Sequence, residues 1–349
     1  MVLHGTRPTG HDGGHLTTPT GSRPWEPMDL PIHTEAGTRP WSPVDLARWM
    51  ARWRPQARAT LVIVAIVLAC GFVVAVMAAG PMAAGTSSHT GFGFDTRSYW
   101  GFPRLSLYPG PGTDDGYGFY RYSPAFVPFL VVVSAGPWTV FAVGWLAMLV
   151  GVYIWMAGDE RWPLLVFVPV LFEFYLGNIH LLLALAVVLG FRWPGTWAFV
   201  LLTKITPGIG LWWFVVRREW RSLAIALGVT GAIVMAGILV SPGVWRDWYL
   251  SLTVTGPATG SNQIPVPLPI RLLAALLLLT WGARTDRRWT VVVATTLALP
   301  TLWFHGLAML VGIVALHHGQ PERLAASIER VTQRLRTAAG DLQPDRAEA

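Results

Sequence analysis

About ten runs of apolar residues follow one another between residues 59 and 316, separated by short polar, glycine-containing or proline-containing stretches. An α-helix needs roughly 20 apolar residues to cross the hydrocarbon core of a bilayer, and backbone groups in lipid must be paired within the protein. The runs therefore predict an all-α polytopic integral membrane protein. Several runs are short, so we expect some to be half-spanning helices. The expected spans are 59–80, 123–136, 138–157, 163–176, 179–191, 196–215, 222–240, 268–282, 289–302 and 303–316.

The composition agrees with a membrane protein. Hydrophobic residues make up 53% of the chain and charged residues only 13%, whereas a soluble domain carries about 25% charged residues. The net charge of +7 comes from arginines beside apolar runs, which indicates membrane topology and anionic lipid rather than nucleic acid. The chain has no P-loop, dinucleotide fingerprint or metal-ligand motif. We therefore expect neither a cofactor nor a metal site.

Three segments are expected. Residues 1–58 are rich in Gly, Pro, Thr, Arg and His and predict a disordered cytoplasmic tail, in which the phrase RPWxPxDL occurs twice. This repeat is open to two interpretations, a docking motif or a duplication without a role. Residues 59–316 form the transmembrane domain, and residues 317–349 form a charged, partly helical cytoplasmic tail. The single cysteine, Cys70, excludes an intramolecular disulfide.

The arginines predict the orientation, because cytoplasmic loops carry an excess of basic residues. Four arginines precede the first span, and alternation of ten spans places the basic loops 217–221 and 284–288 and both termini on the same cytoplasmic side. The loops 81–122 and 241–267 and the junction 299–306 then face out. The candidate residues on this outer side are Asp95, Asn262, Gln263 and His305.

Asp95 lies in the loop stretch GFGFDTRSYWGF, residues 91–102. A solvated acid or a helix cap is one interpretation. The alternative is a site that handles an amphiphile with a phosphate and a sugar, since aromatic and basic side chains at a membrane surface suit such a ligand. The neighbouring residues that favour this alternative are Arg97, Tyr99, Trp100 and Arg104.

Other ionisable residues lie within or at the ends of the apolar runs. Lys204 is the only lysine of the chain, and an ionisable residue at membrane depth is a functional candidate, although snorkelling to the interface is the alternative. Arg271 is a candidate phosphate ligand, and His305 is either a satisfied interfacial histidine or a phosphate ligand. Glu173, with the nearby Asn178 and His180, predicts a polar cluster where two short helices meet. Because the expected topology turns this cluster inward, we expect it to serve packing.

Several stretches in chain order resemble glycosyltransferase family 87, the polyprenol-phosphate-mannose-dependent type of membrane GT-C enzyme. The stretches are GFDTRSYWGFPRLSLYPG, YRYSPAFVPFL, LGNIHLLLALAVVLG, LLTKITPGIGLWWFVVRREW, GSNQIPVPLPIRLL and LPTLWFHGL. The resemblance covers residues 59–316. It departs from the family pattern at Ile264, where a small hydroxyl residue is expected, and at Asn178, where glutamine is usual.

The resemblance implies a GT-C-type fold with a large first extracytoplasmic loop and a hexosyltransferase in the plasma membrane. A sugar, with mannose expected first, would pass with inversion from a polyprenyl-phosphate donor to an extracytoplasmic glycolipid or glycan acceptor. The resemblance makes Asp95 the general base. The implied ligands of the donor phosphate or substrate are Lys204, Arg271, His305, Asn262, Gln263, Arg97, Tyr99, Arg104 and Tyr122.

Two other functions remain open from the sequence. A transporter or flippase of a lipid-linked sugar or a small solute also uses intramembrane ionisable residues, but it typically shows inverted repeats, and the sequence shows no convincing ones. A catalytically inactive scaffold that recruits partners through the N-terminal repeat is the second. The expected partners of the enzyme are the polyprenyl-phosphate sugar, the glycolipid acceptor and membrane lipid, with no nucleic acid.

Overall fold

The computed structural model describes residues 64, 92–101, 108, 120, 122–254 and 263–341. All of them belong to one unit that comprises residues 43–349. The predicted tail 1–58 lies outside the described residues, as does the first expected span, 59–80, apart from Val64.

The described residues are almost wholly helical. The α-helices of the first half are α3 (Phe94–Gly101), α4 (Val127–Val133), α5 (Trp138–Ala157), α6 (Arg161–Leu164), α7 (Val168–Leu176), α8 (His180–Leu189), α9 (Trp197–Thr203) and α10 (Trp212–Val216). Those of the second half are α11 (Trp220–Val240), α12 (Pro242–Val254), α13 (Leu268–Arg284), α14 (Trp289–Leu297), α15 (Val311–His317) and α16 (Gln320–Asp341). The 3₁₀ helices are η2 (Pro124–Phe126), η3 (Gly158–Glu160), η4 (Pro194–Thr196), η5 (Thr206–Leu211) and η6 (Phe304–Leu310).

The prediction of an all-α membrane protein is confirmed. Within the described ranges there is no β-strand, and the β contact found there is an isolated antiparallel bridge between Gln263 and Trp303. Two helical stretches, Trp138–Leu164 and Trp220–Val240, are long and apolar enough to cross a membrane. The pair α7 and α8, bent by 112°, makes a third span if it is counted as one. The total of about ten spans stays a prediction.

Two apolar runs of the sequence are interrupted helices. The run 196–215 divides into α9, η5 and α10, with the first break at Lys204 and Pro207 at the start of η5. Proline lacks an N–H and its ring clashes with the preceding turn, which accounts for the break. The run 303–316 likewise divides into η6 and α15.

The expected outer loop 241–267 is not wholly a loop, because it contains the helix α12. Pro242 begins this helix, where a missing N–H costs nothing. Trp245 anchors it: the indole is only 7% exposed and lies so close to Gly237 of α11 that an added Cβ there would approach its Nε1 to 2.5 Å. A single buried tryptophan gives no helical periodicity, so the helix was not apparent in the sequence.

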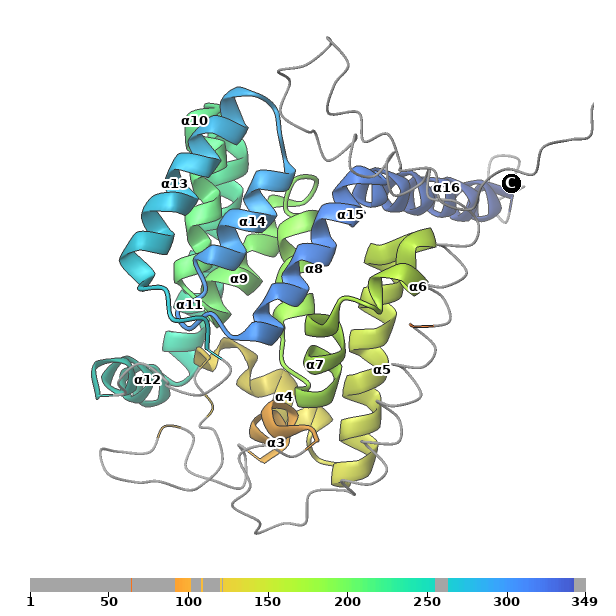
Figure 1. Cartoon of the computed structure of the whole chain (residues 1–349). Coiled ribbons are helices and arrows are strands. Elements are labelled where there is room, and N and C mark those ends of the chain that lie inside the picture. The colour runs from red at the N-terminus through yellow and green to blue at the C-terminus, as the bar shows by residue number, and fades with distance from the viewer. Residues whose placement is uncertain are drawn as a thin grey trace, which may run out of the picture. The chain divides into compact units, whose positions relative to one another are not determined.

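The basic turns and α3 lie toward opposite ends of the helix α5. In Figure 1, α3 lies beside the lower end of α5, whereas α16 and the turn between α13 and α14 lie toward the upper end. Ion pairs join the basic turns: Arg217 to Asp286 at 2.8 Å, and Arg288 to Glu322 of α16 at 3.0 Å. The basic turns 217–221 and 284–288 therefore lie at the same end of the described helices, and the membrane side of this end stays a prediction.

Candidate functional site

Gly177, which ends α7, anchors the loop helix α3. Its φ of 71° is left-handed, a conformation that glycine adopts without strain. The Gly177 carbonyl accepts hydrogen bonds from Thr96 Oγ1 at 3.2 Å and from Trp145 Nε1 at 2.8 Å. The N–H of Gly93 donates to the Tyr175 carbonyl at 2.7 Å. These bonds hold the first turn of α3, and with it Asp95, against the turn between α7 and α8.

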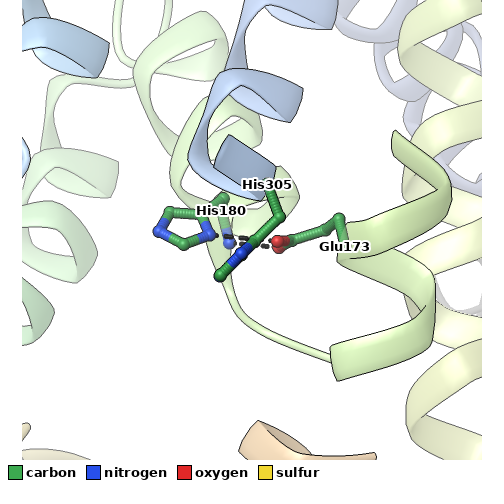
Figure 2. Close-up of side chains that lie close together, drawn as sticks. All are labelled: Glu173, His180 and His305. Carbon is green, nitrogen blue, oxygen red and sulfur yellow. Dashed lines mark hydrogen bonds and ion pairs between the residues drawn. The ribbon is translucent and has the colours of Figure 1, made fainter. Parts of the chain in front are cut away.

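A chain of hydrogen bonds crosses this turn. Glu173 and His180 are fully buried, and His180 Nδ1 lies 3.0 Å from Glu173 Oε2 (Figure 2). Lys204 Nζ lies 2.8 Å from His180 Nε2. A carboxylate only accepts hydrogen bonds and an ammonium only donates them, so we assign the proton to Nδ1 and a neutral ring to His180. The protons then run from Lys204 through His180 to Glu173.

His305 lies between this chain and Asp95. Its ring centre is 5.1 Å from that of His180, and its Nε2 is 3.9 Å from Asp95 Oδ2. The ring is 4% exposed, and neither of its nitrogens has a hydrogen-bond partner among the described residues. Buried polar atoms are normally paired, so both ring nitrogens of His305 have hydrogen-bonding capacity that the described residues do not use.

The surroundings of Asp95 raise the pKa of its carboxyl. Its side chain is 23% exposed, and burial raises the pKa of its carboxyl from 3.8 to about 6. A hydrogen bond with Asn178 lowers this pKa, the charge of Glu173 raises it, and the charge of Lys204 lowers it again. A carboxylate that becomes basic near neutral pH suits a general base.

The aromatic and basic side chains of α3 contact one another and neighbouring aromatic side chains. Arg97 is 8% exposed and stacks its guanidinium over the rings of Trp100 and Trp138, at 4.9 and 5.0 Å from their centres. Tyr99, one helical turn after Asp95, bonds through its hydroxyl to the Tyr122 hydroxyl at 3.1 Å. Tyr99 and Tyr122 therefore lie together beside Asp95, whereas Arg97 is held in an aromatic sandwich.

The Arg271 guanidinium binds backbone carbonyl groups. Arg271 is 4% exposed, and its guanidinium donates to the carbonyls of Val266, Leu297, Leu299 and Pro300 at 2.6 to 3.0 Å. These bonds fix the segment that leads to His305. A ligand role for Arg271 stays a prediction.

The segment around Gln263 pairs with the strand-like residues before His305. The Ile264 N–H donates to the Leu302 carbonyl at 2.8 Å, next to the bridge between Gln263 and Trp303. Asn262 and Arg104 lie outside the described residues, so their predicted roles stay predictions.

A cavity of about 540 Å³ adjoins these polar groups. Its wall is almost wholly apolar and includes Phe126, Leu130, Leu182 and Phe199. Three further lining residues are chain neighbours of the site: Tyr99 shares the face of α3 with Asp95, Ile179 precedes His180, and Thr203 precedes Lys204. An apolar cavity whose lining includes chain neighbours of an imidazole and an ammonium suits an amphiphile with a polar head.

Glu173, His180 and His305 also have the residue types of a metal site. One ligand atom from each lies within 4.8 Å of the others. A metal ligand offers a lone pair, however, and the hydrogen-bond pattern places a proton on His180 Nδ1 and an ammonium at its Nε2. The donor set therefore fits a proton-ordered chain better than a cation.

One expectation from the sequence is wrong. The Glu173 cluster was expected to face inward, away from Asp95, yet the turn at Gly177 carries α3, and His180 lies beside His305. The error came from counting 163–176 and 179–191 as two complete spans. The 112° bend between α7 and α8 returns the chain to the same region. The sequence shows only a glycine after Leu176, and its left-handed conformation is visible in the structure alone.

The sequence model of glycosyltransferase family 87 matches residues 120–331, which is more than half of the chain and includes Glu173, His180, Lys204 and His305 but not Asp95. No curated protein and no solved structure matches the chain. The chain belongs to glycosyltransferase family 87 and is a membrane glycosyltransferase.

Proposed function

We propose that the protein transfers a sugar, mannose in the first instance, from a polyprenyl-phosphate donor to a glycolipid or glycan acceptor, with Asp95 as the general base. The observation that carries the proposal is the convergence of Asp95, His305 and Lys204 beside residues that line an apolar cavity. Asp95 lies 3.9 Å from the buried His305, and the charge of Lys204 acts on the same carboxyl.

The reaction is an inverting substitution at the anomeric carbon. The acceptor hydroxyl oxygen forms the new bond to this carbon while the bond from the carbon to the phosphate oxygen breaks. The leaving polyprenyl phosphate takes the bonding electrons, and Asp95 takes the hydroxyl proton. Lys204 and His305 stabilise the charge that develops on the phosphate, because fixed donors in a water-poor site do so without reorganisation.

The cavity supports a lipid-linked donor over a nucleotide sugar. Its apolar lining has no cation within it to bind a diphosphate, whereas a prenyl chain needs only apolar contact. The membrane side of Asp95 is inferred from the basic residues. The arginine-rich turns lie toward the end of α5 opposite to α3. By the positive-inside rule Asp95 then faces the extracytoplasmic side, where a lipid carrier is needed to deliver the sugar.

The test is the change Asp95→Asn, assayed in membranes that receive labelled polyprenyl-phosphate mannose. General-base catalysis contributes about 10²- to 10⁴-fold, so transfer should fall by this factor at unchanged expression. Asp247→Asn, at an exposed position of α12, is the matched control and should transfer normally. Wild-type transfer by the Asp95 variant would disprove the base assignment. Movement of labelled lipid across the membrane without a new glycosidic bond would favour a flippase.

A further inference from the structure

We infer that Glu173 and His180 are positioning residues, which together hold the Lys204 ammonium in the direction of the donor phosphate. The inference rests on the proposed function, since it names what orients one of the phosphate ligands. It assigns a task to two buried polar residues whose side chains lie in contact with the site but do not carry the reaction.

Glu173 is the fixed end of the chain. Its Oε1 accepts the backbone N–H groups of His180 at 2.6 Å and Leu181 at 3.3 Å, which are among the unpaired donors at the start of α8. Its Oε2 accepts from His180 Nδ1 at 3.0 Å. Three donors therefore hold both oxygens of a side chain with no exposed surface. Such a carboxylate has no freedom to rotate toward a substrate.

His180 transmits this constraint. Because Glu173 accepts at Nδ1, the neutral ring must present a lone pair at Nε2, and this lone pair receives the Lys204 ammonium at 2.8 Å. The ring cannot turn to avoid the contact, since the His180 side chain is also fully buried. Nε2 of His180 is thus an acceptor because Glu173 Oε2 accepts the hydrogen bond from Nδ1, on the opposite side of the ring.

Lys204 gains a defined direction from this contact. A lysine side chain has four rotatable bonds and loses considerable entropy when it is ordered. Lys204 also stands at the end of α9, with a non-helical φ of −138°, so helix geometry does not order it. One of its three N–H groups is used on His180, which leaves two for other acceptors. We place the leaving phosphate there, because a donor that is ordered before the reaction stabilises the transition state most.

The change Glu173→Gln tests the chain with almost no change in volume. The glutamine oxygen can keep the two backbone N–H groups of His180 and Leu181, but its amide nitrogen then donates toward His180 Nδ1. The proton of His180 must move to Nε2, where it opposes the Lys204 ammonium, donor against donor. Lys204 should lose its orientation although nothing has been removed from around it.

We expect kcat/KM for the polyprenyl-phosphate sugar to fall by about 10- to 100-fold in this variant, the factor typical of a hydrogen bond to a charged group. Since Lys204 would contact the phosphate of the bound donor as well as the leaving phosphate, the loss should appear in kcat and in the KM of the donor but not in the KM of the acceptor. The control Glu322→Gln breaks an exposed ion pair with Arg288 and should leave both values unchanged.

A double-mutant cycle separates positioning from damage to the fold. If Glu173 acts through Lys204, then Glu173→Gln should cause less than about a twofold further loss in a Lys204→Met background. Independent losses that multiply, or an equal rise of both KM values, would overturn the inference. So would a wild-type rate in Glu173→Gln. Loss of activity on chelation that Mn²⁺ restores would also overturn it, because Glu173 and His180 would then be metal ligands.

A binding measurement keeps this inference distinct from the proposed reaction. A polyprenyl phosphate should raise the melting temperature of the detergent-solubilised wild-type protein, and the rise should be reduced in both Glu173→Gln and Lys204→Met but retained in Asp95→Asn. If Asp95→Asn still transfers sugar while the two other variants lose phosphate binding, the proposed base is wrong and the positioning chain stands. If all variants bind the phosphate equally, the chain is wrong whatever the outcome for Asp95.

Discussion

Replacement of Gly177 by alanine tests whether the turn between α7 and α8 places Asp95. Gly177 has a φ of 71°, and an added Cβ would lie 1.7 Å from Thr96 Oγ1 and 3.1 Å from Thr96 Cβ. No contact of this length is possible, so Thr96 must move. Thr96 follows Asp95 in α3, and its hydroxyl bonds to the Gly177 carbonyl at 3.2 Å. The variant should therefore separate α3 from the turn.

The cost can be worked from three effects. A left-handed alanine costs about 1–2 kcal/mol. The lost bond of Thr96 adds about 1 kcal/mol, and relief of the overlap adds about 1–3 kcal/mol. The sum is roughly 3–6 kcal/mol, which lowers the melting temperature by at least roughly 6 °C. The rate of sugar transfer should fall as well, because a shift of about 1 Å at a catalytic group costs on the order of 10²-fold in rate.

The assay compares the melting temperature in detergent with sugar transfer at a temperature where every variant is folded. Gly144→Ala in α5 is the matched control, since nothing lies within 4 Å of the added Cβ. Adding Thr96→Ala to Gly177→Ala should recover the overlap part of the cost and leave the backbone strain. A Gly177→Ala protein with an unchanged melting temperature and a normal rate would refute the placement of α3.

Four further predictions concern the same region. Because the pKa of Asp95 is raised to about 6, kcat/KM should fall about tenfold per unit of pH below 6, as measured in a pH–rate profile. The same raised pKa means that Asp95 contributes to the stability of the fold below about pH 4. This contribution is lost as the pH rises through 6, a trend that Asp95→Asn should remove. Arg271→Lys cannot satisfy four carbonyls with one ammonium and should cost roughly 2–4 kcal/mol, visible as a lower melting temperature; an unchanged value would contradict the role of Arg271 as a backbone anchor. Ala186→Trp fills the apolar cavity and should raise the KM of a long-chain donor while sparing a donor with a single isoprene unit, whereas Val140→Trp on an exposed face of α5 should change neither.

The sequence predicted the helices best where composition alone decides. The helix α5 begins and ends at the residues expected from its apolar run, Trp138 and Ala157, because its neighbours Pro137 and Gly158 end the helix on both sides. The helix α12 was missed because its stability depends on a tertiary contact, Trp245 against Gly237. Apolar periodicity does not report such a contact.

The site was predicted in its members more than in its arrangement. Asp95, Lys204 and His305 were named because charged and polar residues are rare in this chain, and rarity is visible in a sequence. The bonds from Lys204 to His180 and on to Glu173 were not predictable. They depend on the 112° bend between α7 and α8, which is a property of packing at Gly177 and not of hydropathy.

The short apolar runs and the position of the site have the same physical cause. Each break in a helix exposes N–H and C=O groups that lipid cannot pair, so a broken helix needs polar side chains around the break. Glu173 caps the N–H groups at the start of α8, and Arg271 pairs the carbonyls that end α14 and follow it. Lys204 stands at the break between α9 and η5, and His305 at the start of η6. The runs that are too short to cross a bilayer are therefore the ones that bring charged groups together, and the site lies where the helices stop.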